Sequence, residues 1–148
     1  DCHVIVASEN KFKWILIHEV FIDRLMLPKC EFIVQFIIGK EYTSLPFIHV
    51  KKTKNEKIDY PLISIAALKK DSRIRLAMSG VCSFPFRASL ELEEYLNDRS
   101  ISREARVENT VNNLPAPVLN DISGSDSYRR FVLKNTLCSV LESLEGIK

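Results

Sequence analysis

The sequence has 148 residues, of which 46% are hydrophobic and 27% are charged, and its formal net charge at pH 7 is +2. This composition is typical of a folded soluble protein, and the apolar runs, such as 32–38, are far shorter than the roughly 20 residues that span a bilayer. The 21 basic residues are dispersed among 19 acidic ones, so we expect neither nucleic acid nor a membrane as a partner.

The N-terminus and the cysteines indicate a cytoplasmic setting. Asp1 is not followed by the basic segment and cleavage site of a secretory signal, so we expect no such signal, and Asp1 is compatible with a processed terminus or a piece of a longer protein. The four cysteines are Cys2, Cys30, Cys82 and Cys138. No two of them form a C-x-x-C pair and the three histidines are isolated, which predicts free, buried thiols and no metal site.

The first forty residues have the pattern of strands. Val4 and Val6 alternate with other residues before the polar turn 8–10, and the segment 12–17 alternates after it. These two segments predict a β-hairpin. The apolar run 31–38 is short enough to be a buried strand rather than a helix, and Gly39 ends it.

A second group of strands follows. We expect the chain to cross between two units at 43–46, because one strand pattern stops there and a new one begins at 47–52. Two alternating runs lie between residues 62 and 81, and Asp71-Ser72 separates them. This arrangement predicts a hairpin with a two-residue turn.

After Pro85 the apolar residues recur with the period of a helix. Ala88, Leu92 and Leu96 fall on one face, which predicts an amphipathic helix. Glu93 and Glu94 suggest a carboxylate pair, but we expect them on the solvent side of this helix.

Two further helices are predicted, the first ending before Pro115 and the second ending at Gly146. The candidate N-caps are Ser100 or Ser102 for the former, and Ser123 or Ser125 for the latter. The last helix has two apolar faces, and we expect both to be covered: Leu133, Leu137, Val140, Leu141 and Leu144 on one, and Tyr128, Phe131 and Val132 on the other. Strands followed by helices predict an α+β fold, a small antiparallel sheet backed by a three-helix layer.

No motif in the chain carries catalysis or holds a dinucleotide. The four glycines form neither G-x-G-x-x-G nor G-x-x-x-x-G-K-[ST], so the backbone amides that cradle a pyrophosphate are missing. There is no G-x-S-x-G elbow and no Cys/His signature. We therefore expect no catalytic residue and no tightly bound dinucleotide in this chain alone.

Two motifs nevertheless resemble a known family. They are Gly80–Ala88, GVCSFPFRA, and Asp121–Arg130, DISGSDSYRR, and the segment 59–64, DYPLIS, precedes them. In this order and spacing they resemble the C-terminal domain of the FAD-binding (medium) subunit of molybdenum hydroxylases, the xanthine dehydrogenase and aerobic carbon monoxide dehydrogenase group. On this resemblance, residues 43–148 form the C-terminal domain and residues 1–42 are the tail of the FAD-binding domain.

The resemblance implies a part in an oxidoreductase. In this family, electrons from the molybdenum centre pass through iron-sulfur clusters to FAD, and the C-terminal domain covers one side of the flavin and docks partner chains. The implied cofactor is FAD in the complete subunit. The implied partners are the FAD-binding N-terminal portion and the iron-sulfur and molybdenum-cofactor subunits or domains. The glycine-rich portion that binds FAD has no counterpart here, so the chain is either a fragment or a shortened protein.

The resemblance also suggests cofactor-binding residues. Lys51, Lys52 and Lys54 belong to a lysine-rich segment that a pattern argument alone treats as a solvated loop. In the family the corresponding loop approaches the flavin, where a cation favours the anionic reduced ring. The family's usual arginines are replaced here by lysine and asparagine.

The motif residues also have structural interpretations. Gly80 suits a bulge or close packing, Pro85 suits a helix start, and Arg87 suits either a carboxylate partner or the capping of carbonyls. Tyr128-Arg129-Arg130 suits helix packing and surface charge. The alternative function is a non-enzymatic α+β interaction or assembly module that has lost flavin binding, and a third is an independent enzyme acting on a small molecule, for which the sequence offers no support.

Overall fold

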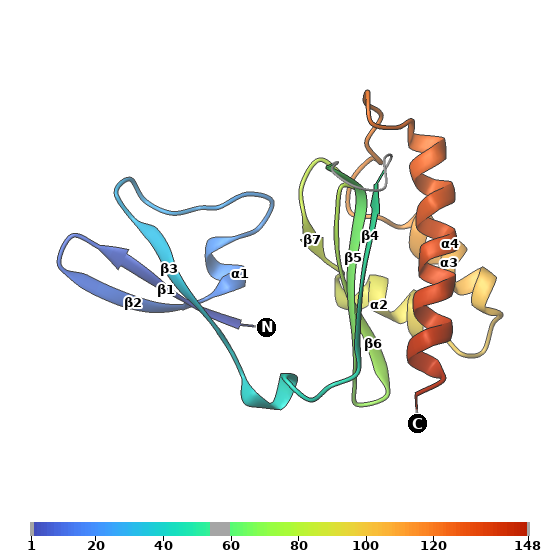
Figure 1. The fold of residues 1–148 in the computed structure, drawn as a ribbon, viewed down its shortest axis with the longest axis horizontal. Helices are drawn as coiled ribbons and strands as arrows, with labels where there is room; N and C mark the ends of the chain where they lie inside the picture. The colour runs from blue at the N-terminus through green and yellow to red at the C-terminus, as the bar shows by residue number, and fades with distance from the viewer. Residues whose placement is uncertain (1, 54–59, 148) are drawn as a thin grey trace. The chain divides into compact units, whose positions relative to one another are not determined.

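The structure is a computed structural model that describes residues 2–53 and 60–147. It divides into two compact units, Asp1–Leu45 (unit 1) and Pro46–Lys148 (unit 2), each with its own antiparallel sheet (Figure 1). Helices complete both units, so the predicted α+β class is confirmed.

Unit 1 is a three-stranded sheet with one short helix. Its elements are β1 Cys2–Ser8, β2 Lys11–Leu16, α1 Ile17–Val20, β3 Phe32–Ile38 and the 3₁₀ turn η1 Lys40–Tyr42. The strand order is β2-β1-β3, which confirms the predicted first hairpin and third strand. The core of the unit is small, because its fully buried cluster consists of Val4, Val6 and Val20.

The sheet of unit 2 has four strands in the order β4-β5-β6-β7. They are β4 Phe47–Thr53, β5 Pro61–Lys70, β6 Arg73–Ser79 and β7 Phe86–Arg87. The hairpin between β5 and β6 turns at Asp71 and Ser72, whose φ angles are 51° and 61°. Two consecutive left-handed residues are the signature of a type I′ turn, so the predicted two-residue turn is confirmed.

Three helices complete unit 2: α2 Leu90–Asn97, α3 Arg103–Asn112 and α4 Asp126–Glu145. The hydroxyl groups of Ser102 and Ser125 cap α3 and α4, which decides between the alternative caps. The prediction for the first helix was wrong at its start. Phe86 pairs with Met78 of β6, so the chain after Pro85 is still a strand, and α2 begins only after its cap, Ser89.

The helices lie on one face of the unit 2 sheet, and the main core fills the space between (Figure 1). Ile63 and Ile65 of β5 belong to this core with Leu137 and Leu141 of α4, and all four are fully buried. The expectation that both apolar faces of α4 are covered was wrong, because Phe131 remains 63% exposed. This helix packs mainly through one stripe; of the second stripe, Tyr128 and Phe131 are exposed, while Val132 is half-buried against the core.

All four cysteines are free, as predicted, but the expectation that their thiols are buried was wrong for Cys30. Cys82 is buried and its thiol donates to the carbonyl of Ala116, while Cys30 is exposed. Burial raises the pKa of the Cys82 thiol, which keeps it protonated and unreactive. Across residues 2–53 and 60–147, no helix has both the length and the apolar character required to cross a bilayer.

Candidate functional site

Arg129 joins the two sequence motifs. It lies in the first turns of α4 with 2% of its surface exposed, and its guanidinium donates to the backbone carbonyls of Leu62 and Gly80, the latter at 2.7 Å. It also forms an ion pair of 2.6 Å with Asp121, whose pKa this hydrogen bond lowers. The interpretation of Arg129 as surface charge was therefore wrong, since a buried guanidinium needs this full set of acceptors.

The glycines of the motifs make this close approach possible. Gly80 has a φ of +73°, and a Cβ atom there would lie 2.6 Å from the carbonyl oxygen of Leu62. A Cβ atom at Gly124 would lie 2.7 Å from the Leu62 side chain. Both glycines thus serve packing around Arg129, which confirms the close-packing interpretation of Gly80.

Glu93 is buried, contrary to the expectation of a solvated face. Only 2% of it is exposed, its Oε1 atom has no hydrogen-bond partner, and the guanidinium of Arg87 lies 3.9 Å away. Desolvation raises the pKa of Glu93, and the nearby charge of Arg87 opposes this effect. Glu94 is exposed as expected. The pairing suggested for Arg87 is therefore present, with a buried carboxylate.

The lysines proposed as flavin-proximal are divided between the two faces of a strand. Lys51 and Lys52 are exposed residues near the end of β4 rather than members of a loop. Lys51 pairs with Ser64 and Lys52 pairs with Ile63, so successive side chains point to opposite faces of the sheet. Lys54 lies outside the described residues.

Lys52 lines a groove between β4 and α4. The groove has a volume of about 390 Å³, and its walls include Val50, Leu62, Phe131 and Asn135. Among the residues that the structure describes, no carboxylate lies within ion-pair distance of the Lys52 ammonium group. An apolar wall, an exposed aromatic ring and one unpaired cation suit one edge of a planar aromatic anion.

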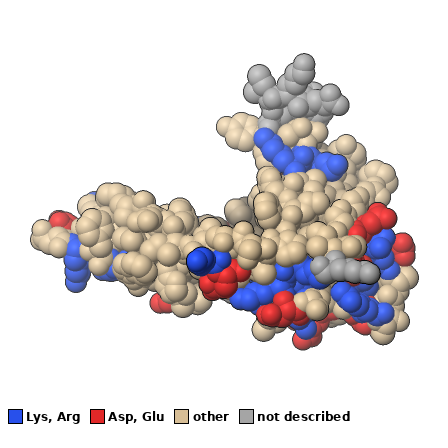
Figure 2. Space-filling model, turned by 60° about the horizontal axis from the view of Figure 1, so that its bottom comes forward, with Lys and Arg blue, Asp and Glu red and all other residues tan. Residues whose placement is uncertain are grey.

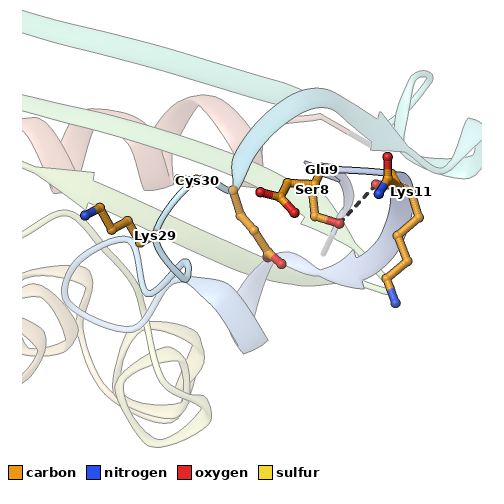
Figure 3. A pocket seen from close by; sticks show the side chains of 7 residues that line it. Ser8, Glu9, Lys11, Lys29 and Cys30 are labelled. Carbon is orange, nitrogen blue, oxygen red and sulfur yellow. Dashed lines mark hydrogen bonds between the residues drawn. The ribbon is translucent and has the colours of Figure 1, made fainter.

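A second hollow lies in unit 1, beside the turn between β1 and β2 (Figure 3). It measures about 690 Å³ and is lined by Ser8, Glu9, Asn10, Lys11, Lys29, Cys30 and Glu31. Its lysines and glutamates balance each other in charge, and Glu31 already forms an ion pair with Lys13. Sequence reasoning did not single out this hollow, and its balanced charge selects no class of ligand.

The described residues do not present a cradle for the pyrophosphate of FAD. Gly80 and Gly124 are packed around Arg129, a Cβ atom at Gly39 would meet the Glu41 carboxylate, and Gly146 ends α4. The residues here fit a flavin ring edge at the Lys52 groove but not the dinucleotide phosphates.

No family model matches the sequence, and the search of curated proteins gave no match either. Solved structures do match. A carbon monoxide dehydrogenase from Hydrogenophaga pseudoflava that lacks the Mo-pyranopterin moiety of its cofactor has a TM-score of 0.78 at 15% identity, covering 98% of this chain and 53% of that chain. Quinoline 2-oxidoreductase from Pseudomonas putida 86 has a TM-score of 0.74 at 19% identity, with 98% and 53% coverage. Reconstituted CO dehydrogenase from Oligotropha carboxidovorans has a TM-score of 0.77 at 14% identity, and the match covers 99% of this chain and 54% of that chain.

The fold predicted from the two motifs is therefore confirmed. Nearly the whole chain has the fold of a chain found in carbon monoxide dehydrogenase and quinoline 2-oxidoreductase, although sequence identity is low. The chain spans about half the length of the solved chains that it matches.

Proposed function

We propose that this chain is the C-terminal portion of an FAD-containing electron-transfer subunit of a molybdenum hydroxylase, of the xanthine dehydrogenase or carbon monoxide dehydrogenase type. Residues 43–148 would be its C-terminal domain, and residues 1–42 the tail of its FAD-binding domain. The observation that carries the proposal is the convergence of both motifs on Arg129 in a chain with this fold.

In this proposal the domain closes one side of the flavin site. Lys52 is the best placed of the three candidate lysines, because it lines a groove with an aromatic wall. FAD would supply the electron-transfer chemistry when bound. The chain's own contribution would be the Lys52 charge beside the ring, which favours an electron-rich flavin, and apolar surface that excludes water.

The proposal assigns the phosphates of FAD to another polypeptide portion. The matched enzymes have chains about twice as long, and the glycines described here are engaged in packing. The partners would be the FAD-binding portion and the iron-sulfur and molybdenum-cofactor subunits or domains, in the cytoplasm. Docking them fits a chain in which we identify no catalytic residue.

A titration with FAD tests this assignment. The chain alone should take up no stoichiometric FAD, whereas a mixture with the cognate FAD-binding portion should give a yellow complex. Tight FAD uptake by the chain alone would contradict the proposal. A colourless mixture would favour the alternative, an interaction module without flavin.

A pair of lysine variants tests the flavin-proximal charge. In the yellow complex, Lys52→Gln should lower the reduction potential of the flavin, because a cation near the ring is lost. Lys51→Gln removes the same charge from the opposite face of the same strand and should change the potential far less. A spectroscopic redox titration measures the potentials. Equal potentials for both variants would show that Lys52 does not lie near the flavin ring.

A further inference from the structure

The sheet of unit 1 is apolar on both of its faces. On one face, Val4 and Val6 pack against Val20 of α1, although Phe36, the β3 partner of Val4, remains 61% exposed there. The opposite face, here called the open face, consists of the residues that alternate with Val4 and Val6 and of their cross-strand partners. Its apolar members include Ile5, Ala7, Phe12, Trp14, Phe32 and Ile37.

No element of unit 1 covers the open face. Phe12 is 70% exposed, Trp14 is 66% exposed and Phe32 is 60% exposed. Phe12 and Phe32 flank Ala7 in one cross-strand row, and Trp14 pairs with Ile5 in the next row, so the exposed rings form one continuous surface. Lys, Arg, Asp and Glu occupy little of unit 1 on the side that Figure 2 shows.

The sheet of unit 2 provides an internal comparison. Its helix-covered face carries Ile65 and Leu76, while its other face carries mainly polar or small residues, such as His49, Ser64 and Arg75. One apolar and one polar face is the normal pattern for a sheet covered on one side only. Two apolar faces indicate a sheet that is covered on both sides in the assembled protein.

We infer that the open face of unit 1 is an interface, and that its occupant is the polypeptide portion that the matched enzymes possess beyond the region shared with this chain. The solved chains are about twice as long as the matched region, so they contain enough polypeptide for one more layer. The inference rests on the proposed function for the identity of this portion, which is the FAD-binding one. The inference goes beyond the proposed function because it assigns the surface of this chain to which that portion docks.

Trp14 makes the inference directly measurable. It is the one tryptophan in the sequence and it lies within the open face. The full chain, produced with 5-fluorotryptophan, gives a single fluorine resonance whose solvent isotope shift reports exposure of this ring. In the free chain we expect full exposure, and the cognate FAD-binding portion, added unlabelled and without FAD, should shield the ring.

Substitutions test whether the association depends on the open face rather than on any exposed apolar residue. Phe12→Lys combined with Phe32→Lys should weaken the association by about tenfold or more, since aromatic anchors carry most of an interface's affinity. Ile122→Lys, at a residue of unit 2 that is 96% exposed, is the matched control and should leave it unchanged. All three positions are exposed, and far-UV circular dichroism verifies that each variant is folded.

The outcomes distinguish this inference from the proposed function. Shielding of Trp14 without later uptake of FAD would support the interface and contradict the flavin role. Uptake of FAD with Trp14 still exposed would support the flavin role and contradict the interface. A ring already shielded in the free chain, either within a monomer or in a self-associated form detected by sedimentation, would overturn the inference.

Discussion

At the scale of single residues, Arg129 holds together segments that are distant in sequence. Its guanidinium contacts carbonyls from the start of β5 and the end of β6, and the carboxylate of Asp121. The two carbonyls belong to the buried Leu62 and the half-buried Gly80, so removing the guanidinium leaves them without this donor, whereas the Asp121 side chain is exposed. Arg129 is therefore a structural residue, and its effect is expected in stability rather than in redox chemistry.

The substitution Arg129→Met tests this role. It should lower the free energy of unfolding of unit 2 by about 1–3 kcal/mol for each of the Leu62 and Gly80 carbonyls that it leaves without a donor. Arg99→Met is the control, because the Arg99 side chain is 60% exposed and its ion pair with Glu145 is 4.0 Å long. The control should cost less than about 1 kcal/mol. Urea denaturation measures both, and equal losses would show that Arg129 has no special role.

Glu93 predicts a dependence of stability on pH. Burial raises the pKa of this carboxyl group in the folded state above its value of about 4 in the unfolded chain. Ionisation of Glu93 therefore lowers the stability of the fold as the pH rises from the unfolded pKa through the folded pKa. Glu93→Gln should therefore be more stable than the parent chain near neutral pH, with a difference that shrinks towards about pH 4. Unfolding free energies across this pH range measure it.

The adjacent residue supplies the control for this experiment. Glu94→Gln changes the same chemistry at an exposed position of the same helix, so it should leave the pH dependence of unfolding close to that of the parent chain. If Glu93→Gln is less stable than the parent chain at neutral pH, the ion pair with Arg87 outweighs desolvation.

At the scale of elements, the β5–β6 hairpin depends on a turn with two left-handed residues. Residues with a Cβ atom are strained at such φ angles, whereas glycine is not. Ser72→Gly should therefore raise the free energy of unfolding by about 0.5–1 kcal/mol. Ser83→Gly is the control, because Ser83 is exposed and lacks a positive φ, and it should be neutral or destabilising. A loss of stability in both variants would contradict the turn assignment.

At the scale of the whole molecule, the two units differ in how much core they contain. Among the residues that the structure describes, the core cluster of unit 2 has 21 buried residues, whereas that of unit 1 has 3. Covering exposed rings such as Phe12 and Trp14 would contribute about 1.5–3 kcal/mol each. A layer over the open face would thus supply stabilisation that unit 1 does not contain.

This difference predicts how the units behave when separated. Residues 46–148 alone should unfold in one cooperative transition, whereas residues 1–45 alone should show the spectrum of a largely unfolded peptide. Thermal unfolding followed by circular dichroism measures both. A cooperative transition for residues 1–45 would show that its small core suffices and would weaken the case for a missing layer.

The local elements were predictable because their signals lie within a few neighbouring residues. Alternation located the strands, Asp71-Ser72 located a hairpin turn, and the capping serines located two helices. Prediction was wrong where a residue's environment comes from elsewhere in the chain. Glu93 lies on a charged stretch of sequence but is buried, and Phe131 lies on an apolar stripe but faces solvent.

The candidate site was predictable only in part. The lysine segment stood out in the sequence, but pairing with β5 sends Lys51 and Lys52 to opposite faces and brings Lys52 alone to the groove. Nothing in the sequence placed Phe131 and Asn135 beside β4, because they are separated from this strand by about half the chain. The network around Arg129 was likewise missed, since its acceptors are backbone carbonyls that no motif identifies.

The amino-acid sequence by itself determined the order and type of the longer strands and helices and the α+β class, because periodicity, turn chemistry and caps are local properties. Two short motifs indicated the likeness to molybdenum hydroxylases. Only the tertiary structure decided which charged groups are buried, which lysine meets a groove and which sheet face stays open. Those properties depend on contacts between residues far apart in the chain, and burial is the sum of such contacts.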